Sequence, residues 1–527
     1  MILTKYQRAL GAYQSKSSNP SHITSVAYNE TNPTAKPEPK PENELGAQPT
    51  PPVVATGGGT ASDPNEIGWN DLDDPNNPRN WSVRKRAYTI GVVMAVLMTT
   101  STASSAIAPA VPQVLADFHT DDTFSGTLIV SIELLAFGFG PLIFAPLSEV
   151  YGRRIIYCLA NFGFSVVTVG CALSPNLQFL IGFRFLQGLA ASCATSHGGG
   201  TIGDLVPTHH RGAVTSVYTG ALLFGPTLGP IFGGYLADAH GWRWVFWLLV
   251  IMNGSVALLY AVTCRETYAP ILLARKAIRI REETGNQELY AQGQQNKLPL
   301  GRLLRRSIVR PTRMLLFSPI VTGLSLYIAT VYGLVYLLFS TFSFVFDDQY
   351  HIPESNRGVV YLGLAIGMLI SLIISGVVCD SIYKRLTKKH GKEKPEYRLE
   401  SMIWGAIATP VGLLIYGWTT QYLVHPAVPI FATGFVGFGV TFTYIPIQVY
   451  LIDAYTKYSA SATAAASVIR AIAGALLPLA GLPMYDRLGL GWGNSLLAFL
   501  AIGLAILPLY FVRVGERWRQ RFSVEFD

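Results

Sequence analysis

Charged side chains are scarce in this sequence. Only 14% of its 527 residues are Asp, Glu, Lys or Arg, whereas 50% are hydrophobic. A soluble globular protein of this length needs more polar surface than these residues provide, because its exterior has to be hydrated. The composition therefore argues against a soluble protein and predicts a chain that lies largely within a membrane.

Signatures of enzymatic chemistry are missing as well. The chain has no GxxxxGK[ST] loop for ATP and no GxSxG turn for a nucleophilic serine, and its nine histidines are scattered. Its five cysteines fall inside or at the ends of apolar runs, without the spacing of a disulfide framework or a metal site. We therefore expect no enzyme, no catalytic residue, no metal and no cofactor. An ion gradient remains as the source of energy.

The net charge of +8 does not indicate a nucleic-acid partner. The basic residues lie between apolar segments and not in a stripe with interleaved aromatic residues. The chain does not open with a charged region followed by a short apolar run, so we expect no cleaved signal peptide. The first long apolar segment, which begins near Ala87, should itself direct membrane insertion.

Long apolar segments make up most of the remaining chain. Each is long enough to cross a hydrocarbon core of roughly 30 Å. A polar and basic connection over residues 265–313 divides these segments into six and six. We predict an all-α integral membrane protein with twelve transmembrane helices in two six-helix bundles. The predicted spans are 87–108, 126–147, 155–174, 178–198, 212–236, 244–264, 315–340, 358–379, 399–418, 427–452, 462–484 and 492–512.

The domain organisation follows from the positions of the polar stretches. Residues 1–80 are rich in Pro, Ser, Thr, Asn and Gly and are predicted to form a disordered cytosolic tail. An N-terminal bundle over 81–264, a cytosolic central loop over 265–313 and a C-terminal bundle over 314–512 should follow. The chain should end in a cytosolic tail over 513–527.

Basic residues also predict the orientation in the membrane. If both termini are cytosolic, Arg84–Arg86, Arg153–Arg154, residues 265–313 and residues 384–398 all face the cytosol. Few basic residues then face the other side. This asymmetry is the one that the positive-inside rule predicts, and an odd number of spans would destroy it.

The fifth segment contains many small residues. The stretch Gly220–Gly234 reads GALLFGPTLGPIFGG and would form a poor helix in water, because glycine and proline weaken helices. In a membrane, small residues let two helix backbones approach closely, so we predict a bent helix with a bare packing seam. We expect Gly220, Gly229 and Gly233 to share a rough face. The predicted seam consists of Gly220, Gly225, Pro226, Gly229, Pro230, Gly233 and Gly234.

The pattern GPxxGPxxGG in this segment resembles the antiporter motif of proton-coupled exporters in the major facilitator superfamily. In that family the motif is thought to seal the two halves against proton leak. By spacing alone, any membrane helix with a small-residue packing face would look the same.

A second resemblance lies in the loop after the second segment, which reads APLSEVYGRR over Ala145–Arg154. It is similar to the first signature loop of the superfamily, GxLaDrxGRr, although Ala145 replaces the first glycine and Glu149 the aspartate. Two arginines beside a glycine turn and a carboxylate can hold helix ends in one arrangement and release them in another. The alternative is that the arginines only set the topology. The predicted gate residues here are Glu149, Gly152, Arg153 and Arg154.

The loop after the fourth segment contains another candidate for this cytoplasmic gate. Asp204 and Arg211 lie on the two sides of a proline turn. We expect an ion pair between them, and the phrase DxxPxxxRG also recurs in the superfamily.

Two ionisable residues lie inside apolar segments. Arg184 in the fourth segment must face a cavity or a partner, because an unpaired arginine at the centre of a span costs about 2.5–3.5 kcal/mol. Glu133 in the second segment is the matching acid, and its affinity for protons would depend on burial and on a nearby Arg184. The alternatives are a snorkelling arginine and a structural carboxyl group. By resemblance to the second signature of the superfamily, RxxQG, Arg184 and Glu133 are the predicted proton-coupling pair.

The second half contributes further candidates. Tyr327, Tyr332 and Tyr336 recur in the seventh segment and, together with Gln187, are the candidate lining of a substrate cavity, because aromatic rings with polar tips suit amphipathic molecules. Lipid-facing packing of the tyrosines is the alternative. Asp453 and Arg470 are a possible second-half pair, although spacing alone does not establish it.

From about Asp74 to the C-terminus the chain is similar to fungal drug:proton antiporters of the twelve-helix class. The resemblance implies a monomeric, proton-coupled efflux pump in the plasma membrane or, alternatively, the vacuolar membrane. It would export drugs, fungicides or secondary metabolites by alternating access. We expect uncharged or weakly cationic cargo, because Glu133 is the clearest carboxyl group inside a span. A polyamine/proton antiporter, an inward proton symporter and a non-transporting sensor are the alternatives.

Overall fold

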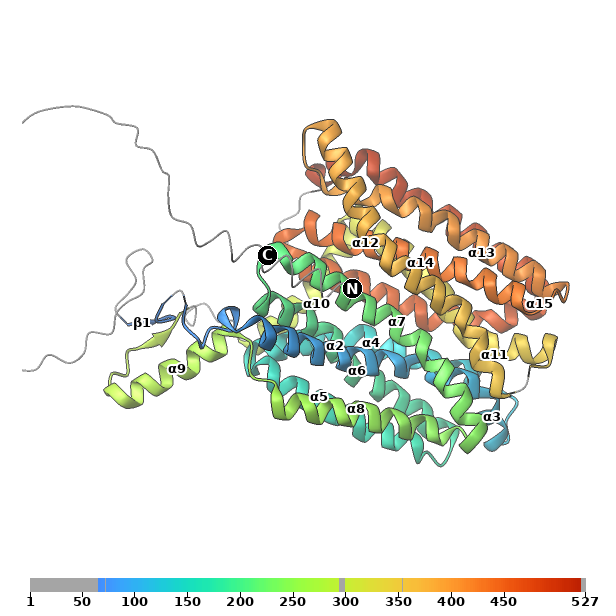
Figure 1. The fold of residues 1–527 in the computed structure, drawn as a ribbon, viewed down its shortest axis with the longest axis horizontal. Helices are drawn as coiled ribbons and strands as arrows, with labels where there is room; N and C mark the ends of the chain where they lie inside the picture. The colour runs from blue at the N-terminus through green and yellow to red at the C-terminus, as the bar shows by residue number, and fades with distance from the viewer. Residues whose placement is uncertain (1–64, 72, 293–298, 353, 523–527) are drawn as a thin grey trace, which may run out of the picture. The chain divides into compact units, whose positions relative to one another are not determined.

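The computed structural model describes residues 65–71, 73–292, 299–352 and 354–522, most of which form long helices (Figure 1). The elements in chain order are β1 (Glu66–Ile67), η1 (Pro78–Asn80), α2 (Val83–Ala106), η2 (Ala108–Ala110), α3 (Val111–Asp117), α4 (Thr123–Tyr151), α5 (Arg153–Ala172), α6 (Leu177–Leu205), α7 (Thr208–His240), α8 (Arg243–Thr263), α9 (Ala269–Thr284), β2 (Tyr290–Ala291), α10 (Leu300–Phe317), α11 (Pro319–Tyr350), η3 (Glu354–Tyr361), α12 (Leu362–His390), η4 (Pro395–Met402), α13 (Ile403–Gln421), α14 (Ala427–Ala454), η5 (Thr456–Tyr458) and α15 (Ser459–Arg521).

The predicted twelve spans are confirmed. Within the described ranges, eleven helices are long and apolar enough to cross a membrane. The last of them, α15, has 63 residues and is broken at Gly489, where φ is 73° and ψ is 168°. Glycine tolerates this left-handed backbone because it has no Cβ. The two arms of α15 therefore supply two spans.

Two buried apolar clusters correspond to the two halves of the fold. The first is formed by residues between Trp81 and Cys264. The second is formed mainly by residues between Met314 and Phe511, but it also includes Leu134 of α4 and Leu223 of α7. The two halves therefore share an apolar contact at their interface.

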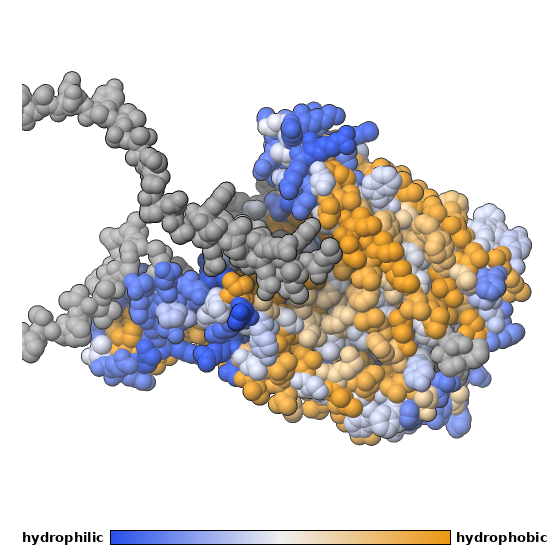
Figure 2. Space-filling model, viewed as in Figure 1, coloured by the Kyte–Doolittle hydropathy of each residue, from blue (hydrophilic) through white to orange (hydrophobic). Residues whose placement is uncertain are grey.

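Large apolar side chains cover the outer faces of the helices. Phe162, Val262 and Leu316 are 69%, 75% and 73% exposed. Figure 2 shows a broad hydrophobic surface over the helices, whereas hydrophilic residues gather around α9 and at the end of α12. This distribution suits lipid contact, because each helix satisfies its own backbone hydrogen bonds and presents only side chains to the hydrocarbon.

The structure describes residues 65–71 and 73–80 of the predicted disordered tail, and there it differs from the prediction. Glu66 and Ile67 in β1 pair in parallel with β2 of the central connection. Lys276 of α9 donates hydrogen bonds to the Gly68 carbonyl at 2.8 Å and to Asn70 Oδ1 at 2.6 Å. Lys276 and its partners are roughly two hundred residues apart along the chain, so local composition could not reveal these contacts. The rest of the predicted tail, residues 1–64, lies outside the described residues.

The predicted C-terminal tail also differs from the structure. Instead of ending near residue 512, α15 continues to Arg521. Trp518 packs against Tyr510 and Phe511, with ring centroids 6.1 Å apart in each case. Lys394 Nζ contacts Glu516 Oε2 at 2.5 Å. Contacts with the preceding turns and with η4 therefore keep this polar sequence helical.

Candidate functional site

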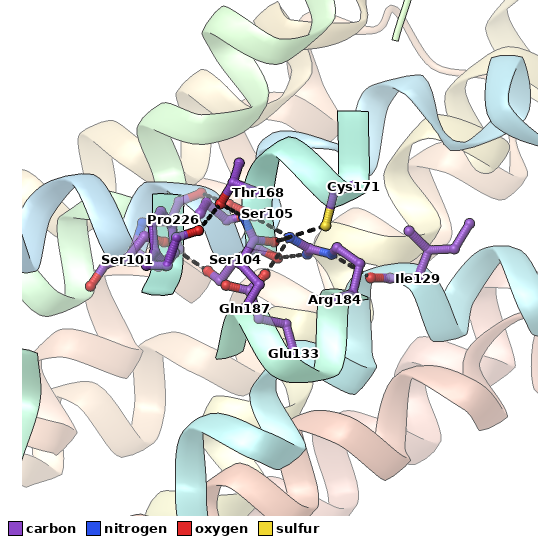
Figure 3. A network of polar contacts seen from close by, with 12 residues as sticks. Ser101, Ser104, Ser105, Ile129, Glu133, Thr168, Cys171, Arg184, Gln187 and Pro226 are labelled. Atoms are coloured by element: carbon purple, nitrogen blue, oxygen red, sulfur yellow. Dashed lines mark hydrogen bonds and ion pairs between the residues drawn. The ribbon is translucent and has the colours of Figure 1, made fainter. Parts of the chain in front are cut away.

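Arg184 of α6 is completely buried and surrounded by acceptors (Figure 3). Its Nε donates to the Ile129 carbonyl at 2.9 Å. Nη1 donates to the Ala103 carbonyl at 3.1 Å and to Gln187 Oε1 at 2.8 Å. Nη2 donates to the Ser104 carbonyl at 3.2 Å. The guanidinium group therefore ties α6 to α2 and α4 and does not snorkel towards the membrane surface.

Glu133 of α4 forms an ion pair with Arg184 through its Oε2, and its side chain is 1% exposed. The close approach of their helices depends on Gly188, because a Cβ there would lie 2.0 Å from the Glu133 carbonyl oxygen. The structure thus brings together the two residues predicted to couple protons.

The burial of this pair makes each charge dependent on the other. Removing one partner of a buried ion pair costs about 3–5 kcal/mol, because the other charge stays in a medium of low polarity. Protonation of Glu133 would likewise leave Arg184 without its countercharge. The arrangement can therefore respond to a proton, provided that water reaches the carboxyl group.

A small cavity beside Glu133 provides a place for such a water molecule. It has room for about one water molecule. Ser104 Oγ lies 2.9 Å from Tyr336 Oη, and Tyr332 Oη donates to Tyr336 Oη at 3.4 Å. The cavity therefore connects the buried pair to α11 in the second half. Its lining consists of Ser101, Ser104, Glu133, Leu134, Phe137, Leu222, Pro226, Tyr332 and Tyr336.

Two of the predicted cavity residues lie elsewhere. Tyr327 does not line this cavity, because five residues are about 1.4 turns of a helix and turn it away from the face of Tyr332. Gln187 does not line it either. Its Nε2 donates to Thr168 Oγ1 at 2.8 Å while its Oε1 accepts from Arg184. Gln187 therefore positions the arginine.

The glycine seam of α7 packs closely on α2. A Cβ at Gly225 would lie 2.6 Å from Ser101 Cβ, one at Gly229 would lie 2.4 Å from the Thr102 carbonyl oxygen, and one at Gly233 would lie 1.9 Å from that of Ala106. Ser105 Oγ donates to the Pro226 carbonyl. Pro226 and Pro230 both lie inside the continuous helix. The two backbones meet with no space for a side chain between them.

The predicted grouping of Gly220 with Gly229 and Gly233 is wrong. A Cβ at Gly220 would meet Leu372 of α12 in the second half. The nine residues from Gly220 to Gly229 are about 2.5 helical turns, so the two glycines point in opposite directions. Gly234 has a third environment, because a Cβ there would lie 3.0 Å from the Gly358 nitrogen of η3. The seam therefore contacts both halves.

At the predicted cytoplasmic gate, Asp204 pairs with Arg153 and not with Arg211. Arg153 Nε lies 2.5 Å from Asp204 Oδ2. Arg211 instead donates through Nη2 to the Gly203 carbonyl at 3.0 Å. The turn after α6 folds Arg211 back onto the last carbonyls of that helix, where a cation is favoured. Asp204 therefore pairs with Arg153 at the start of α5.

The other gate residues also have identifiable surroundings. Gly152 has φ 95°, and a Cβ there would lie 2.5 Å from Glu266 Oε2. Arg154 Nη2 donates to the Ala261 carbonyl at 2.8 Å. Glu149 is exposed at the end of α4. The loop is therefore built around the Arg153 ion pair, with Glu149 at its margin.

The predicted second-half pair does not form. Asp453 Oδ2 accepts from Arg398 Nε at 2.6 Å, and Arg398 Nη1 also lies 3.2 Å from Asp380 Oδ1. Arg470 lies over the ring of Tyr332, with the guanidinium carbon 4.3 Å from the ring centroid. The end of α14 and the first arm of α15 are separate sites, which spacing along the chain could not distinguish.

Sequence reasoning missed the role of Glu266. Its carboxylate accepts from the backbone N–H groups of Arg153 at 3.1 Å and Arg154 at 3.2 Å, and so caps the start of α5. The only signal in the sequence was an acid directly after the sixth span. Arg398 was missed too, although it lies in a basic connection like that of the first half.

Comparisons with known proteins find relatives over most of the chain. A family model described as Major Facilitator Superfamily matches residues 93–478. The MFS-type transporter atr4 of Stereocaulon alpinum is 46% identical over 464 residues, which cover 87% of this chain and 83% of that protein. The efflux pump radE of Floropilus chiversii is 44% identical over 467 residues, covering 88% and 87%.

A solved structure supports the fold alone. The chain resembles the partially occluded inward-open conformation of the xylose transporter XylE from E. coli with a TM-score of 0.60. The two are 16% identical, and the match covers 81% of this chain and 98% of that chain.

Proposed function

Because the chain belongs to the major facilitator superfamily and is a multi-pass membrane transporter, we propose that it exports amphipathic small molecules in exchange for protons. The observation that carries this proposal is the buried Glu133–Arg184 ion pair beside a cavity that both halves line. An ionisable pair inside a membrane is expensive and is generally retained for transport or proton relay.

The coupling step follows from the contacts of Arg184. When Glu133 takes up a proton, the ion pair is lost, but the guanidinium keeps its carbonyl acceptors on Ile129, Ala103 and Ser104. Arg184 therefore stays in position while the charge of the cavity changes. The Ser104–Tyr336 contact joins the same region to α11, so the change of charge at Glu133 takes place beside a contact between the two halves.

Exchange also requires that protons do not leak between the halves. The seam of α7 supports this requirement on both sides. At Gly229 and Gly233 a Cβ would overlap backbone atoms of α2 in the same half, and at Gly220 and Gly234 a Cβ would meet Leu372 and the Gly358 nitrogen in the other half. At Gly229 and Gly233 the backbones leave no room for a side chain. We propose that the dry seam keeps proton movement tied to Glu133.

For the cellular setting, we propose a monomer in the plasma membrane with both termini in the cytosol. The excess of basic residues on that side supports the orientation. Protons would then enter from outside as cargo leaves, and the proton gradient would supply the energy.

Proton flux in vesicles tests the proposal. The full chain is reconstituted with its cytosolic face outward around an acidic lumen, and a neutral aromatic probe, the methyl ester of 7-methoxycoumarin-4-acetic acid, is added outside. Antiport predicts probe uptake together with a rise of luminal pH. Glu133→Gln should abolish the pH change, whereas Glu282→Gln, which alters an exposed carboxylate on α9, should leave it intact.

The rival functions give other results. A fall of luminal pH on probe addition would indicate a symporter, and binding without any flux would indicate a sensor. Growth of yeast expressing the protein provides a further comparison, in which the proposal predicts protection from amphipathic drugs that exceeds protection from spermine. Greater protection from spermine would favour a polyamine antiporter. Intact pH-driven transport in Glu133→Gln would refute the role of this residue.

A further inference from the structure

Arg470 of α15 is a buried cation that the proton-coupling pair does not use. The residue is 3% exposed. In the part of the chain that the structure describes, its Nε and Nη1 have no hydrogen-bond partner, and no carboxylate forms an ion pair with it. Aromatic rings surround the guanidinium carbon instead, with centroids of Tyr332 at 4.3 Å and Tyr444 at 5.6 Å.

Other buried charges in the described residues have an oppositely charged partner or, as for Glu266, several backbone N–H donors. Arg184 has Glu133, Arg357 lies 2.9 Å from Asp347, and Glu396 lies 3.4 Å from Arg519. Ring faces attract a cation, but they do not accept the hydrogen bonds of a guanidinium fork. Arg470 therefore keeps an unused capacity for a planar, negatively charged acceptor.

The position of Arg470 suits contact with cargo. The ring of Tyr332 lies against Arg470, and Tyr332 also lines the small cavity beside Glu133. On the neighbouring turns of α15, Ala471 faces Gly138 of α4, and Gly474 faces Leu134. Arg470 thus lies at the contact between the two halves. Any separation of the halves that admits cargo must open this contact.

The net charge of the buried groups around the cavity also favours a negatively charged cargo. Glu133 and Arg184 neutralise each other, and Arg470 adds one positive charge without a counterion. Polar atoms extend the site, since Gln448 Nε2 donates to Tyr444 Oη at 2.8 Å. A carboxylate satisfies the arginine fork with two parallel hydrogen bonds, and the aromatic rings contact an apolar body.

We propose that Arg470 is a specificity-determining residue that binds the acidic group of an amphipathic organic anion, such as an aromatic carboxylate. This proposal rests on the transport function proposed above. It departs from the uncharged or weakly cationic cargo expected from the sequence, because that expectation rested on Glu133, whose charge Arg184 offsets in the structure. Asp453, which the sequence suggested as a partner of Arg470, pairs with Arg398 instead.

The test is equilibrium binding of a matched probe pair to the purified full chain. The probes are 7-methoxycoumarin-4-acetate and its neutral methyl ester, and the readout is ligand-dependent thermal stabilisation in detergent at neutral pH. The wild-type protein should bind the acid at least about tenfold more tightly than the ester, as expected for a charge-assisted bidentate pair. Equal binding, or a preference for the ester, would overturn the proposal.

Substitutions of Arg470 test whether the preference for the acid depends on this residue. Arg470→Gln should abolish the preference for the acid while leaving ester binding unchanged, and Arg470→Lys should retain part of it. Arg513→Gln, an exposed arginine on the same helix, is the matched control and should behave as the wild type. If Arg470→Gln does not fold, the Arg470→Lys variant decides the question. A full loss of the preference for the acid both in Arg470→Lys and in the control Arg513→Gln would contradict a binding site at residue 470, because the loss would not be specific to this residue.

Failure of this inference is distinguishable from failure of the proposed function. Binding at equilibrium needs no proton gradient and has no direction. Proton-coupled uptake of the ester with no preference for the acid would overturn only the role of Arg470. A clear preference for the acid without any proton flux would overturn only the exchange mechanism.

Discussion

Two arginines are buried in the two halves of this protein, and their surroundings are opposite. Arg184 in the first half has a carboxylate and four neutral oxygen acceptors. Arg470 in the second half lies between tyrosine rings, and two of its nitrogens have no acceptor among the described residues. The first arginine finds its acceptors within the protein, whereas the second has the unused donors to which the proposal above assigns an acidic cargo. The two buried charges therefore carry different proposals, proton coupling for the first and cargo recognition for the second.

The largest expected effect separates the two arginines by stability. Arg184→Met should destabilise the protein by about 3–5 kcal/mol, because it leaves Glu133 buried without its countercharge. Arg470→Met should cost less than about 1 kcal/mol or be stabilising, because an apolar side chain replaces a cation without a partner carboxylate. Thermal unfolding of both variants in the same detergent measures the difference. Equal losses would show that Arg470 has an unrecognised structural partner.

A second prediction concerns the backbone approach that holds the first pair together. Gly188→Ala should cost about 1–3 kcal/mol, since its Cβ would overlap the Glu133 carbonyl oxygen and push α4 from α6. Gly182→Ala on the same helix has no atom within 4 Å of its Cβ. It should be neutral or stabilising by about 0.5–1 kcal/mol. Unfolding midpoints test the pair, and equal shifts would contradict the role of Gly188.

The seam of α7 offers a functional comparison with a smaller expected effect on stability. Gly229→Ala should open the contact with α2 and allow proton leak without cargo, because its Cβ would lie 2.4 Å from the Thr102 carbonyl oxygen. Gly254→Ala on α8 meets nothing within 4 Å and serves as the control. The decay of a pH gradient across vesicles without probe measures the leak. A gradient that is equally stable in both variants would remove the sealing role.

The smallest expected effect concerns the rings around Arg470. Tyr332→Leu removes one ring face and should lower stability by about 1–2 kcal/mol through loss of a desolvated cation–π contact. Tyr332→Phe keeps the ring and loses only the hydroxyl group, which bonds Tyr336 at 3.4 Å and also contacts Arg470, so it should cost less than about 1 kcal/mol. Calorimetry of the two variants tests this order. The reverse order would mean that the hydroxyl, and not the ring, stabilises this site.

Much of the architecture could be predicted because a membrane imposes a simple rule on each span. About twenty apolar residues are needed to cross the hydrocarbon, so the twelve spans could be counted along the chain. Arg184 and Glu133 stood out for the same reason, as ionisable groups inside such spans. The boundaries were less reliable, because β1 and the end of α15 are ordered by contacts that composition does not encode.

The sequence by itself determined the membrane class, the number of spans and the residues whose burial demands compensation. Only the tertiary structure decided which residue compensates which. Asp204 binds Arg153 and Asp453 binds Arg398, while Gly220 faces the second half and Arg470 has aromatic neighbours. The physical reason is that transfer into lipid acts on each segment separately. Ion pairs, cavities and helix contacts instead depend on how distant segments rotate and pack, and spacing along one chain does not record that.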